Sequence, residues 1–460
     1  METYLDGMKA IMPELVLTAL ALGVLVLDLL MKGKNSRIVG YFTVTGLAVI
    51  GMMLVTRIDD APQTVFGMVT VDSFGTFFKL FTVAALIVVS VFVMSDRKER
   101  QHGIGEYYFL LLGAAVGIFF MVSTYHLLLL VLGIELLSLS SYALAGFHKG
   151  DRKSGEAAMK YVVFGGLSAQ LSSNVLPVGI AVVLILAGFA YKVSIVPFHF
   201  WAPDVYEGSP TPVTTFLAVA SKAAGVGALL RFLGGLFIGT DLTQVQEVVA
   251  QYGDQVGKLV AIVAAVTMTL GNFAAMRQSS LKRMLAYSSI AHAGYVLIGV
   301  AAMSQVGFSA AMYYLAAYYF MNLGAFGVLL YFESSAGSDK IDALRGFGYK
   351  APLISIAMVA FLVSLTGLPP TVGFYGKYLL FQVGIEAELM WLVVVAALNS
   401  VISLFYYFRV AKALFLKDET EKSVIAQPLF AGMLGVLGVL TILFGLMPGT
   451  IQDLVSRCGL

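Results

Sequence analysis

Charged residues are scarce in this chain. Asp, Glu, Lys and Arg together make up 12% of the 460 residues, whereas soluble globular domains carry about 25%. Hydrophobic residues reach 59% of the sequence, and the mean hydropathy is +0.88. This balance excludes a soluble globular protein and predicts a polytopic membrane protein.

Sequence features of metal, redox and nucleotide chemistry are also missing. The only cysteine, Cys458, excludes an internal disulfide and a cysteine-ligated metal or iron–sulfur site. The sequence contains no His-Glu-x-x-His motif, no GxxxxGK phosphate loop and no dinucleotide-binding fingerprint. The formal net charge of +2 gives no indication of a nucleic-acid partner. We therefore expect no cofactor, no metal and no redox chemistry within this chain.

Apolar runs of about 20 residues dominate the sequence, and their length is typical of membrane-spanning helices rather than of barrel strands. We predict an all-α fold with about 14 such spans. The predicted spans are 11–31, 38–56, 73–95, 107–123, 126–147, 157–172, 178–200, 213–236, 259–276, 285–303, 309–332, 354–384, 390–416 and 429–446.

The loops between these spans alternate in charge. Basic clusters follow the first, third, fifth, ninth and thirteenth spans, whereas the opposite loops are acidic or neutral. The positive-inside rule then places the basic loops in the cytoplasm and both termini outside. Lys282 and Arg283 fall in one of the basic loops, so we interpret them as topology determinants. The first ten residues show no cleavable signal, and we expect the first apolar run to be retained.

A proline-rich break separates two apolar runs that each contain a lysine. Lys192 precedes the break and Lys222 follows it, with four prolines between them. A charged residue at membrane depth costs about 2.5–3.5 kcal/mol on insertion scales, and such residues usually line an ion path. Broken helices with buried ionisable groups indicate a transport site. The alternative is that a lysine near a helix end extends to the headgroups, which applies more readily to Lys192 than to Lys222.

The second half of the chain has a similar interruption. Gly367, Pro369 and Pro370 break the apolar run of 354–384 close to Lys377. Two interrupted apolar segments in corresponding halves are typical of transporters built from repeats. This weak internal repeat predicts two related halves, each with a broken helix.

Glu135 and Lys160 complete the set of candidate site residues. Glu135 has apolar turns on both sides, so its carboxyl group must be neutral or paired. Lys160 lies near the start of its span, and both a functional role and an extended surface position remain open for it. In general, burial lowers the pKa of a lysine and a nearby carboxylate raises it again, which suits proton release and uptake. His126, His199 and His292 are weaker candidates, because a lone histidine is more often a structural group.

Three stretches carry a resemblance to a known family. They are KVSIVPFHFWAPDVYEGSPTPVTTFLAVASK, SSLKRMLAYSSIAHAGY and GLPPTVGFYGKYLL. With the span pattern, they resemble the antiporter-like membrane subunits of the proton-pumping NADH:quinone oxidoreductase, respiratory complex I, and most closely the subunit-N branch related to mitochondrial subunit 2. The resemblance covers nearly the whole chain.

The resemblance implies 14 helices with two inverted five-helix repeats around a hydrophilic axis. The expected parts are residues 1–106 (three N-terminal helices), 107–236 (first repeat), 237–416 (second repeat) and 417–460 (C-terminal helix). It also implies roles in a proton relay. Glu135 pairs with Lys192, Lys222 passes the proton towards the second half, Lys377 is the exit-side lysine, and Lys160 matches a further lysine of the family.

The resemblance further implies partners and a location. NADH, FMN, iron–sulfur clusters and quinone are expected in partner subunits, and the neighbours are the antiporter-like subunit M and the small subunits K and J. The location is the bacterial inner membrane, with both termini on the periplasmic side. One departure stands out: between Ser172 and Val178 the chain is shorter than the family pattern. Two alternatives remain open, a subunit of a multi-subunit sodium/proton antiporter and a structural membrane anchor with inert buried charges.

Overall fold

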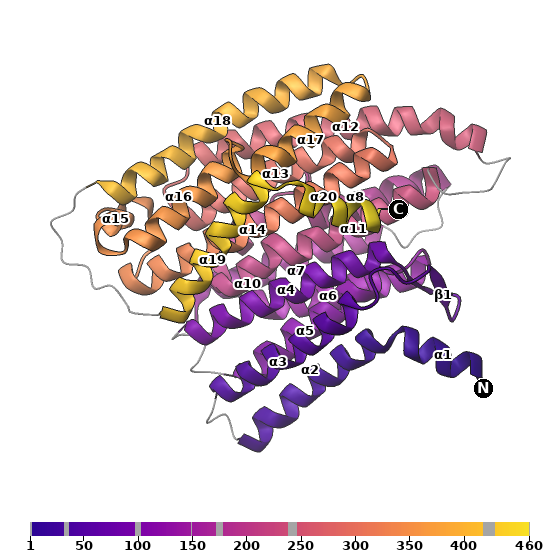
Figure 1. Ribbon diagram of the computed structural model, residues 1–460, viewed down its shortest axis with the longest axis horizontal. Coiled ribbons are helices and arrows are strands. Elements are labelled where there is room, and N and C mark those ends of the chain that lie inside the picture. Colours follow the sequence, from indigo (N-terminus) through magenta and orange to yellow (C-terminus); the bar gives the residue numbers. More distant parts are fainter. Residues whose placement is uncertain are drawn as a thin grey trace. The chain divides into compact units, whose positions relative to one another are not determined.

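A computed structural model of the chain (Figure 1) describes residues 2–31, 36–96, 103–148, 150–171, 178–237, 246–416 and 428–459. Helices account for most of the described residues, and the strands found among them form one two-stranded hairpin. The predicted all-α fold is confirmed.

Two compact units are present. The first comprises Met1–Phe189, Gly208–Phe232 and Arg457–Leu460, and the second comprises Ala190–Glu207 and Leu233–Ser456.

The first unit is built from apolar helices around a small hairpin. Its elements are α1 (Glu2–Ala10), α2 (Met12–Met31), α3 (Ser36–Val55), β1 (Gln63–Val65), β2 (Val69–Val71), α4 (Ser73–Ser95), α5 (Ile104–Met121), α6 (Leu127–Ala145), α7 (Arg152–Leu171), most of α8 (Val178–Val193), α10 (Thr211–Phe216), the π-helical turn η2 (Leu217–Ser221) and most of α11 (Lys222–Phe237). Helix α5 packs against α6 and α2, and α3 packs against α4.

A glycine lets α5 and α6 approach each other closely. A Cβ atom at Gly117 of α5 would lie 2.6 Å from the backbone nitrogen of Leu137 in α6. No side chain fits at that separation, so the contact requires glycine. Close approach through small residues is the usual way in which membrane helices pack.

The second unit contains the longest helices. Its elements are α9 (Trp201–Gly208), α12 (Gln246–Met276), α13 (Leu281–Ala301), α14 (Gln305–Ala336), the 3-10 turn η3 (Ile341–Leu344), α15 (Phe347–Lys350), α16 (Pro352–Thr366), α17 (Val372–Glu386), α18 (Met390–Phe415), α19 (Pro428–Leu446) and most of α20 (Gly449–Cys458). Helices α13 and α14 are almost completely buried. Many serines, tyrosines and a histidine lie on these two helices, so the centre of the unit is polar as well as buried.

Eleven helices in the described part of the chain are long and apolar enough to cross a membrane. They coincide with 11 of the predicted spans. Of the other three predictions, 157–172 lies mostly in α7, which is 20 residues long but less apolar than the eleven. The range 178–200 includes the shorter helix α8, and 354–384 divides into α16 and α17. The protein is thus an integral multi-pass membrane protein. The shortening predicted between Ser172 and Val178 falls on residues 172–177, which lie outside the described residues.

Both predicted helix breaks are confirmed. Helix α8 ends at Val193, Ser194 has a left-handed φ of 64°, and the next helix begins only at Trp201. Helix α16 ends at Thr366, and Gly367 has a φ of 86° before α17 begins at Val372. A third irregularity has no counterpart in the sequence analysis: the π-helical turn η2 lies directly before Lys222. Such turns are frequent at functional sites.

Cys458 gives a chemical test of the packing of α20, which follows the last membrane span. Its side chain is buried, and burial, assisted by the negative charge of Asp59, raises the pKa of the thiol to about 11. At pH 8 only about one thiol in a thousand is then a reactive thiolate. We expect slow alkylation of Cys458 by iodoacetamide in the folded protein and rapid alkylation after denaturation. Equal rates in the two states would contradict this packing.

Candidate functional site

Lys377 lies in α17, shortly after the break that separates this helix from α16, and its side chain is 4% exposed. Its ammonium nitrogen Nζ donates hydrogen bonds to the backbone oxygens of Leu365, at 3.2 Å, and Thr366, at 2.8 Å. It also donates to Ser400 Oγ of α18, at 2.9 Å. The last carbonyl groups of a helix have no partner within the helix and carry a partial negative charge. The break in α16 therefore supplies acceptors for a cation at depth.

An aromatic ring completes the surroundings of this amine. Lys377 Nζ lies 4.3 Å from the centroid of the Tyr295 ring, a distance at which a cation is attracted to the ring face. Among the residues that the structure describes, no carboxylate forms an ion pair with Lys377. The charged form is thus held by carbonyl dipoles, a hydroxyl and a π face alone. Such a group can hold a proton without being locked to a fixed countercharge.

Gly367 allows the Lys377 side chain to occupy this position. A Cβ atom at Gly367 would lie 2.7 Å from Lys377 Cδ, and its φ of 86° is already unfavourable for other residues. We expect Gly367→Ala to displace Lys377 and to lower the Tm of the purified protein. Gly337→Ala is the matched control, because Gly337 also has a positive φ, 67°, but has open space around it. An equal decrease in Tm in the two variants would show that backbone strain alone, and not displacement of Lys377, accounts for the effect.

A histidine between two tyrosines forms the polar centre of the second unit. His292 Nδ1 is 2.6 Å from the hydroxyl oxygen of Tyr314, and His292 Nε2 is 3.1 Å from that of Tyr407. Tyr407 also bonds to the hydroxyl of Ser288. The Tyr295 ring is close to both this cluster and Lys377, because its centroid is 5.8 Å from that of His292 and 4.3 Å from Lys377 Nζ. Imidazole and hydroxyl groups both donate and accept, so the cluster can pass a proton.

This cluster was only partly predicted. The sequence makes His292 only a weak candidate, whereas the structure shows that both of its ring nitrogens are hydrogen-bonded. The tyrosines were missed. Their signal was the occurrence of Tyr314, Tyr318 and Tyr407 inside apolar runs, where a buried hydroxyl usually requires a partner. Of the other two candidate histidines, His126 is exposed immediately before α6 and His199 is buried.

Lys192 and Lys222 are both 3% exposed. Lys192 lies in the last turn of α8, immediately before the break, and Lys222 is the first residue of α11, immediately after η2. The alternative that Lys192 extends outwards from a helix end is therefore wrong. Each lysine is buried beside an irregular stretch of backbone, the arrangement already seen at Lys377.

Glu135 and Lys160 differ from these buried lysines. Glu135 lies in α6 and is half-buried. Lys160 forms an ion pair at 2.9 Å with Glu156 one helical turn earlier, and the two side chains are 36% and 58% exposed. Glu135, Lys160 and Lys222 belong to the first unit, whereas Lys192 and Lys377 belong to the second. The pairing of Glu135 with Lys192 stays a prediction.

The interpretation of Lys282 and Arg283 as loop residues is wrong. Both lie in the first turn of α13, because Ser280 caps that helix by accepting a hydrogen bond from the backbone nitrogen of Arg283 at 3.1 Å. Lys282 is buried, with Nζ 4.0 Å from Glu333 Oε1. Arg283 bridges two carboxylates of α9, Asp204 at 2.8 Å and Glu207 at 2.7 Å. These residues connect helices of the second unit.

Two buried ion pairs in the first unit were missed. Lys79 of α4 bonds to Glu14 of α2 at 2.5 Å, and both side chains are almost fully buried. Arg231 bonds through two nitrogens to Asp72, at 2.8 and 2.6 Å, and also to the backbone oxygen of Val122. Lys79 carries the same signal as Lys377, a lysine well inside an apolar run.

The fold and these residues define a class: a multi-pass helical membrane protein in which lysines are buried at breaks in the helices, an arrangement typical of transport proteins. Comparison with known proteins gives the family. The family model described as NADH:quinone oxidoreductase/Mrp antiporter, TM, matches residues 124–184 and 169–403. The chain belongs to this family.

Individual relatives are similar over almost their whole length. A protein of Chlorobium chlorochromatii named NADH-quinone oxidoreductase subunit N is 39% identical over 96% of this chain and 92% of its own. That alignment spans 478 positions, more than the 460 residues of this chain, so the relative contains residues that this chain lacks. A second relative, subunit N 2 of Sorangium cellulosum, is also 39% identical, over 97% of this chain and 96% of its own.

Solved structures agree with this assignment. A chain in the structure of respiratory complex I from Thermus thermophilus with bound aureothin matches with a TM-score of 0.80 and 31% identity, covering 96% of this chain and 98% of that chain. A chain of the Mrp complex from Dietzia has a TM-score of 0.83 at 18% identity, covering 98% of this chain and 97% of that chain. The second likeness shows a shared fold only.

Proposed function

We propose that this chain is a proton-translocating membrane subunit of an NADH:quinone oxidoreductase. The observation that carries the proposal is the environment of Lys377. A lysine that is 4% exposed is held at the end of a broken helix by two backbone oxygens, a serine hydroxyl and a tyrosine ring. An inert structural lysine needs a fixed countercharge at this depth, whereas a group that takes up and releases a proton needs acceptors that tolerate both states.

The energy scale fits a step of this kind. Moving one charge through the membrane field requires about 2.3 kcal/mol per 100 mV, and a tenfold change in proton affinity corresponds to about 1.4 kcal/mol. A change in the hydrogen bonding of one buried amine supplies energies of this size. Lysine suits the role better than arginine, which keeps its proton. The His292 cluster gives the second unit hydroxyl and imidazole groups near Lys377.

In this proposal the proton passes through a relay in the order that the family resemblance implies. Glu135 and Lys192 form the entry pair, Lys222 passes the proton on, and Lys377 releases it. The burial of the three lysines supports a place for each of them in the relay. Lys160 has less support, because its side chain is 36% exposed and paired with Glu156. The repeats then correspond to residues 107–236 and 237–416, flanked by residues 1–106 and 417–460.

The rest of the reaction takes place in other subunits. NADH oxidation, FMN, the iron–sulfur clusters and quinone reduction belong to partner chains, and the neighbours in the membrane are subunit M and the small subunits K and J. The complex resides in a bacterial inner membrane, with both termini of this chain on the periplasmic side. The alternating basic and acidic loops support this orientation.

A second candidate function is that of a subunit in a multi-subunit sodium/proton antiporter. The likeness to a chain of the Mrp complex favours it through the fold alone. The relatives that are 39% identical and are named as subunits of NADH-quinone oxidoreductase favour the first function. Co-purification of the chain with NADH-oxidising subunits would decide between the two.

Lys222→Ala tests the relay in the first unit. We expect proton pumping per assembled complex to fall at least about tenfold, because a group that exchanges protons at this position is removed. The measurement is the fluorescence quench of a pH-sensitive dye in inverted membrane vesicles driven by NADH, normalised to the amount of assembled complex. Lys258→Ala is the control, because Lys258 is 67% exposed in a surface pair with Asp254. An effect on assembly without an effect on turnover per complex would favour an inert membrane anchor.

A further inference from the structure

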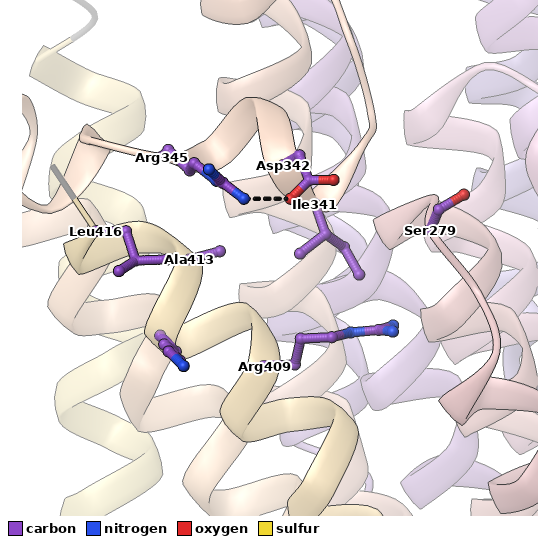
Figure 2. A pocket seen from close by; sticks show the side chains of 8 residues that line it. Ser279, Ile341, Asp342, Arg345, Arg409, Ala413 and Leu416 are labelled. Carbon is purple, nitrogen blue, oxygen red and sulfur yellow. Dashed lines mark hydrogen bonds and ion pairs between the residues drawn. The ribbon is translucent and has the colours of Figure 1, made fainter. Parts of the chain in front are cut away.

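A cationic pocket lies at one end of the second unit, away from Lys377. It has a volume of about 260 Å³ and is lined by residues that precede α13, by the segment around η3 and by the last turns of α18. Three of its lining residues are cations, Arg345, Arg409 and Lys412, and one is an acid, Asp342. Figure 2 shows Arg345 and Asp342 bonded to each other on one side of the pocket and Arg409 on the other.

The positive charge in this pocket is only partly compensated. Arg345 pairs with Asp342 at 3.1 Å. Arg409 donates to the backbone oxygens of Met276, at 3.1 Å, and Gln278, so its guanidinium is fixed in orientation but is not neutralised by these bonds. In the described part of the chain, no carboxylate forms an ion pair with Arg409 or Lys412. The charged side chains that line the pocket therefore carry a net charge of +2.

An exposed apolar stripe on α18 leads to the same pocket. Val401, Phe405 and Phe408 are 68%, 61% and 63% exposed. Together with Lys412 they follow one another at intervals of four, three and four residues, which places them on one face of the helix. Lys412 therefore ends a row of side chains that lie along a membrane-spanning helix. The apolar row suits an acyl chain, and the cations at its end suit an anionic headgroup.

We propose that this pocket and stripe bind an anionic phospholipid, with its phosphate group at Arg345, Arg409 and Lys412 and an acyl chain along Val401, Phe405 and Phe408. Basic pockets between membrane helices on the side of the basic loops recognise such headgroups. The volume of the pocket is slightly below the 300–1,000 Å³ or so that encloses a drug-sized ligand. It therefore suits a headgroup whose tails remain outside. The competing ligand would be an acidic loop of a neighbouring subunit. Such a loop carries the same negative charge as the headgroup, but it has no acyl chain to occupy the apolar row.

The test uses the whole complex that contains this chain, reconstituted into phosphatidylcholine vesicles. The probe is phosphatidylglycerol with a photoreactive group in its acyl chain, and the crosslinked peptides of this chain are mapped. We expect labelling of the segment around Val401 and Phe408 to exceed that by the matching phosphatidylcholine probe at least about fivefold. We expect the double variant Arg345→Gln and Lys412→Gln to lose this preference for phosphatidylglycerol. In the wild type, excess inorganic phosphate should leave the preference unchanged.

The control is Arg277→Gln, which removes one positive charge, as Lys412→Gln does, but from an exposed residue outside the pocket. The Arg277→Gln variant should be labelled to the same extent as the wild type. If the double variant does not assemble, Lys412→Gln alone serves, because this side chain is exposed. Equal labelling by the two probes, or full preference in the Lys412→Gln variant, would overturn the proposal. If excess inorganic phosphate abolishes the labelling, the pocket binds a soluble anion. If the lipid probe does not label the chain and the chain instead crosslinks to a neighbouring subunit, the pocket binds an acidic protein surface. Either result would also overturn the proposal.

Discussion

Complex carrying Lys377→Ala is expected to lose proton pumping by at least about tenfold. The substitution removes the amine that holds the proton. It also leaves the backbone oxygens of Leu365 and Thr366 without this donor, although Ser400 still donates to Thr366. The measurement is NADH-driven acidification of inverted vesicles, compared with NADH oxidation and with the amount of assembled complex in the same membranes.

Two controls separate loss of the proton carrier from loss of packing. Ser400→Ala removes one of the acceptors of Lys377 but keeps the amine, and it should reduce pumping much less than Lys377→Ala. Lys258→Ala removes an exposed lysine of α12 and should have no effect. Full pumping by assembled Lys377→Ala complex would remove the main support for a proton-translocating role.

The second large effect is on stability, and it concerns the Glu14–Lys79 ion pair. Lys79→Met leaves the Glu14 carboxylate buried without its partner. Breaking a buried pair by removing one member costs about 3–5 kcal/mol, so we expect little Lys79→Met protein in the membrane and a clearly lower Tm for what assembles. The measurements are quantitative blotting of membranes and thermal denaturation of the purified complex.

The double variant distinguishes a charge effect from a packing effect. Glu14→Gln in the Lys79→Met background removes the uncompensated charge. Replacing both members of a buried ion pair by uncharged residues often changes the stability of a protein only slightly. We therefore expect the double variant to regain most of the lost stability. A double variant as unstable as Lys79→Met would show that the volume and hydrogen bonds of Lys79 matter more than its charge.

The membrane fold and the helix breaks were predictable because both depend on local sequence. A run of about 20 apolar residues needs no distant partner to indicate a span, and the glycine and prolines after Thr366 interrupt a helix wherever it lies. The burial of Lys192, Lys222 and Lys377 was predictable for the same reason, since each lies in an apolar run.

The contacts of these residues were not predictable, because they come from parts of the chain that are distant in sequence. Nothing near Lys377 indicates that Ser400 of α18 bonds to it, and Glu14 and Lys79 meet across 65 positions. The missed start of α13 is different. Ser280 is a helix-capping residue three positions before Arg283, so the local signal was present and was outweighed by the basic charges that follow it.

The most direct measurement of the central claim is the number of protons moved per NADH oxidised by complex carrying Lys377→Arg. Arginine keeps the positive charge and can donate to carbonyl and hydroxyl oxygens, but it does not release its proton. If Lys377 carries protons, the ratio of protons to NADH falls clearly below the wild-type value in assembled complex. An unchanged ratio in the arginine variant would show that the position requires only a positive charge and would contradict the relay.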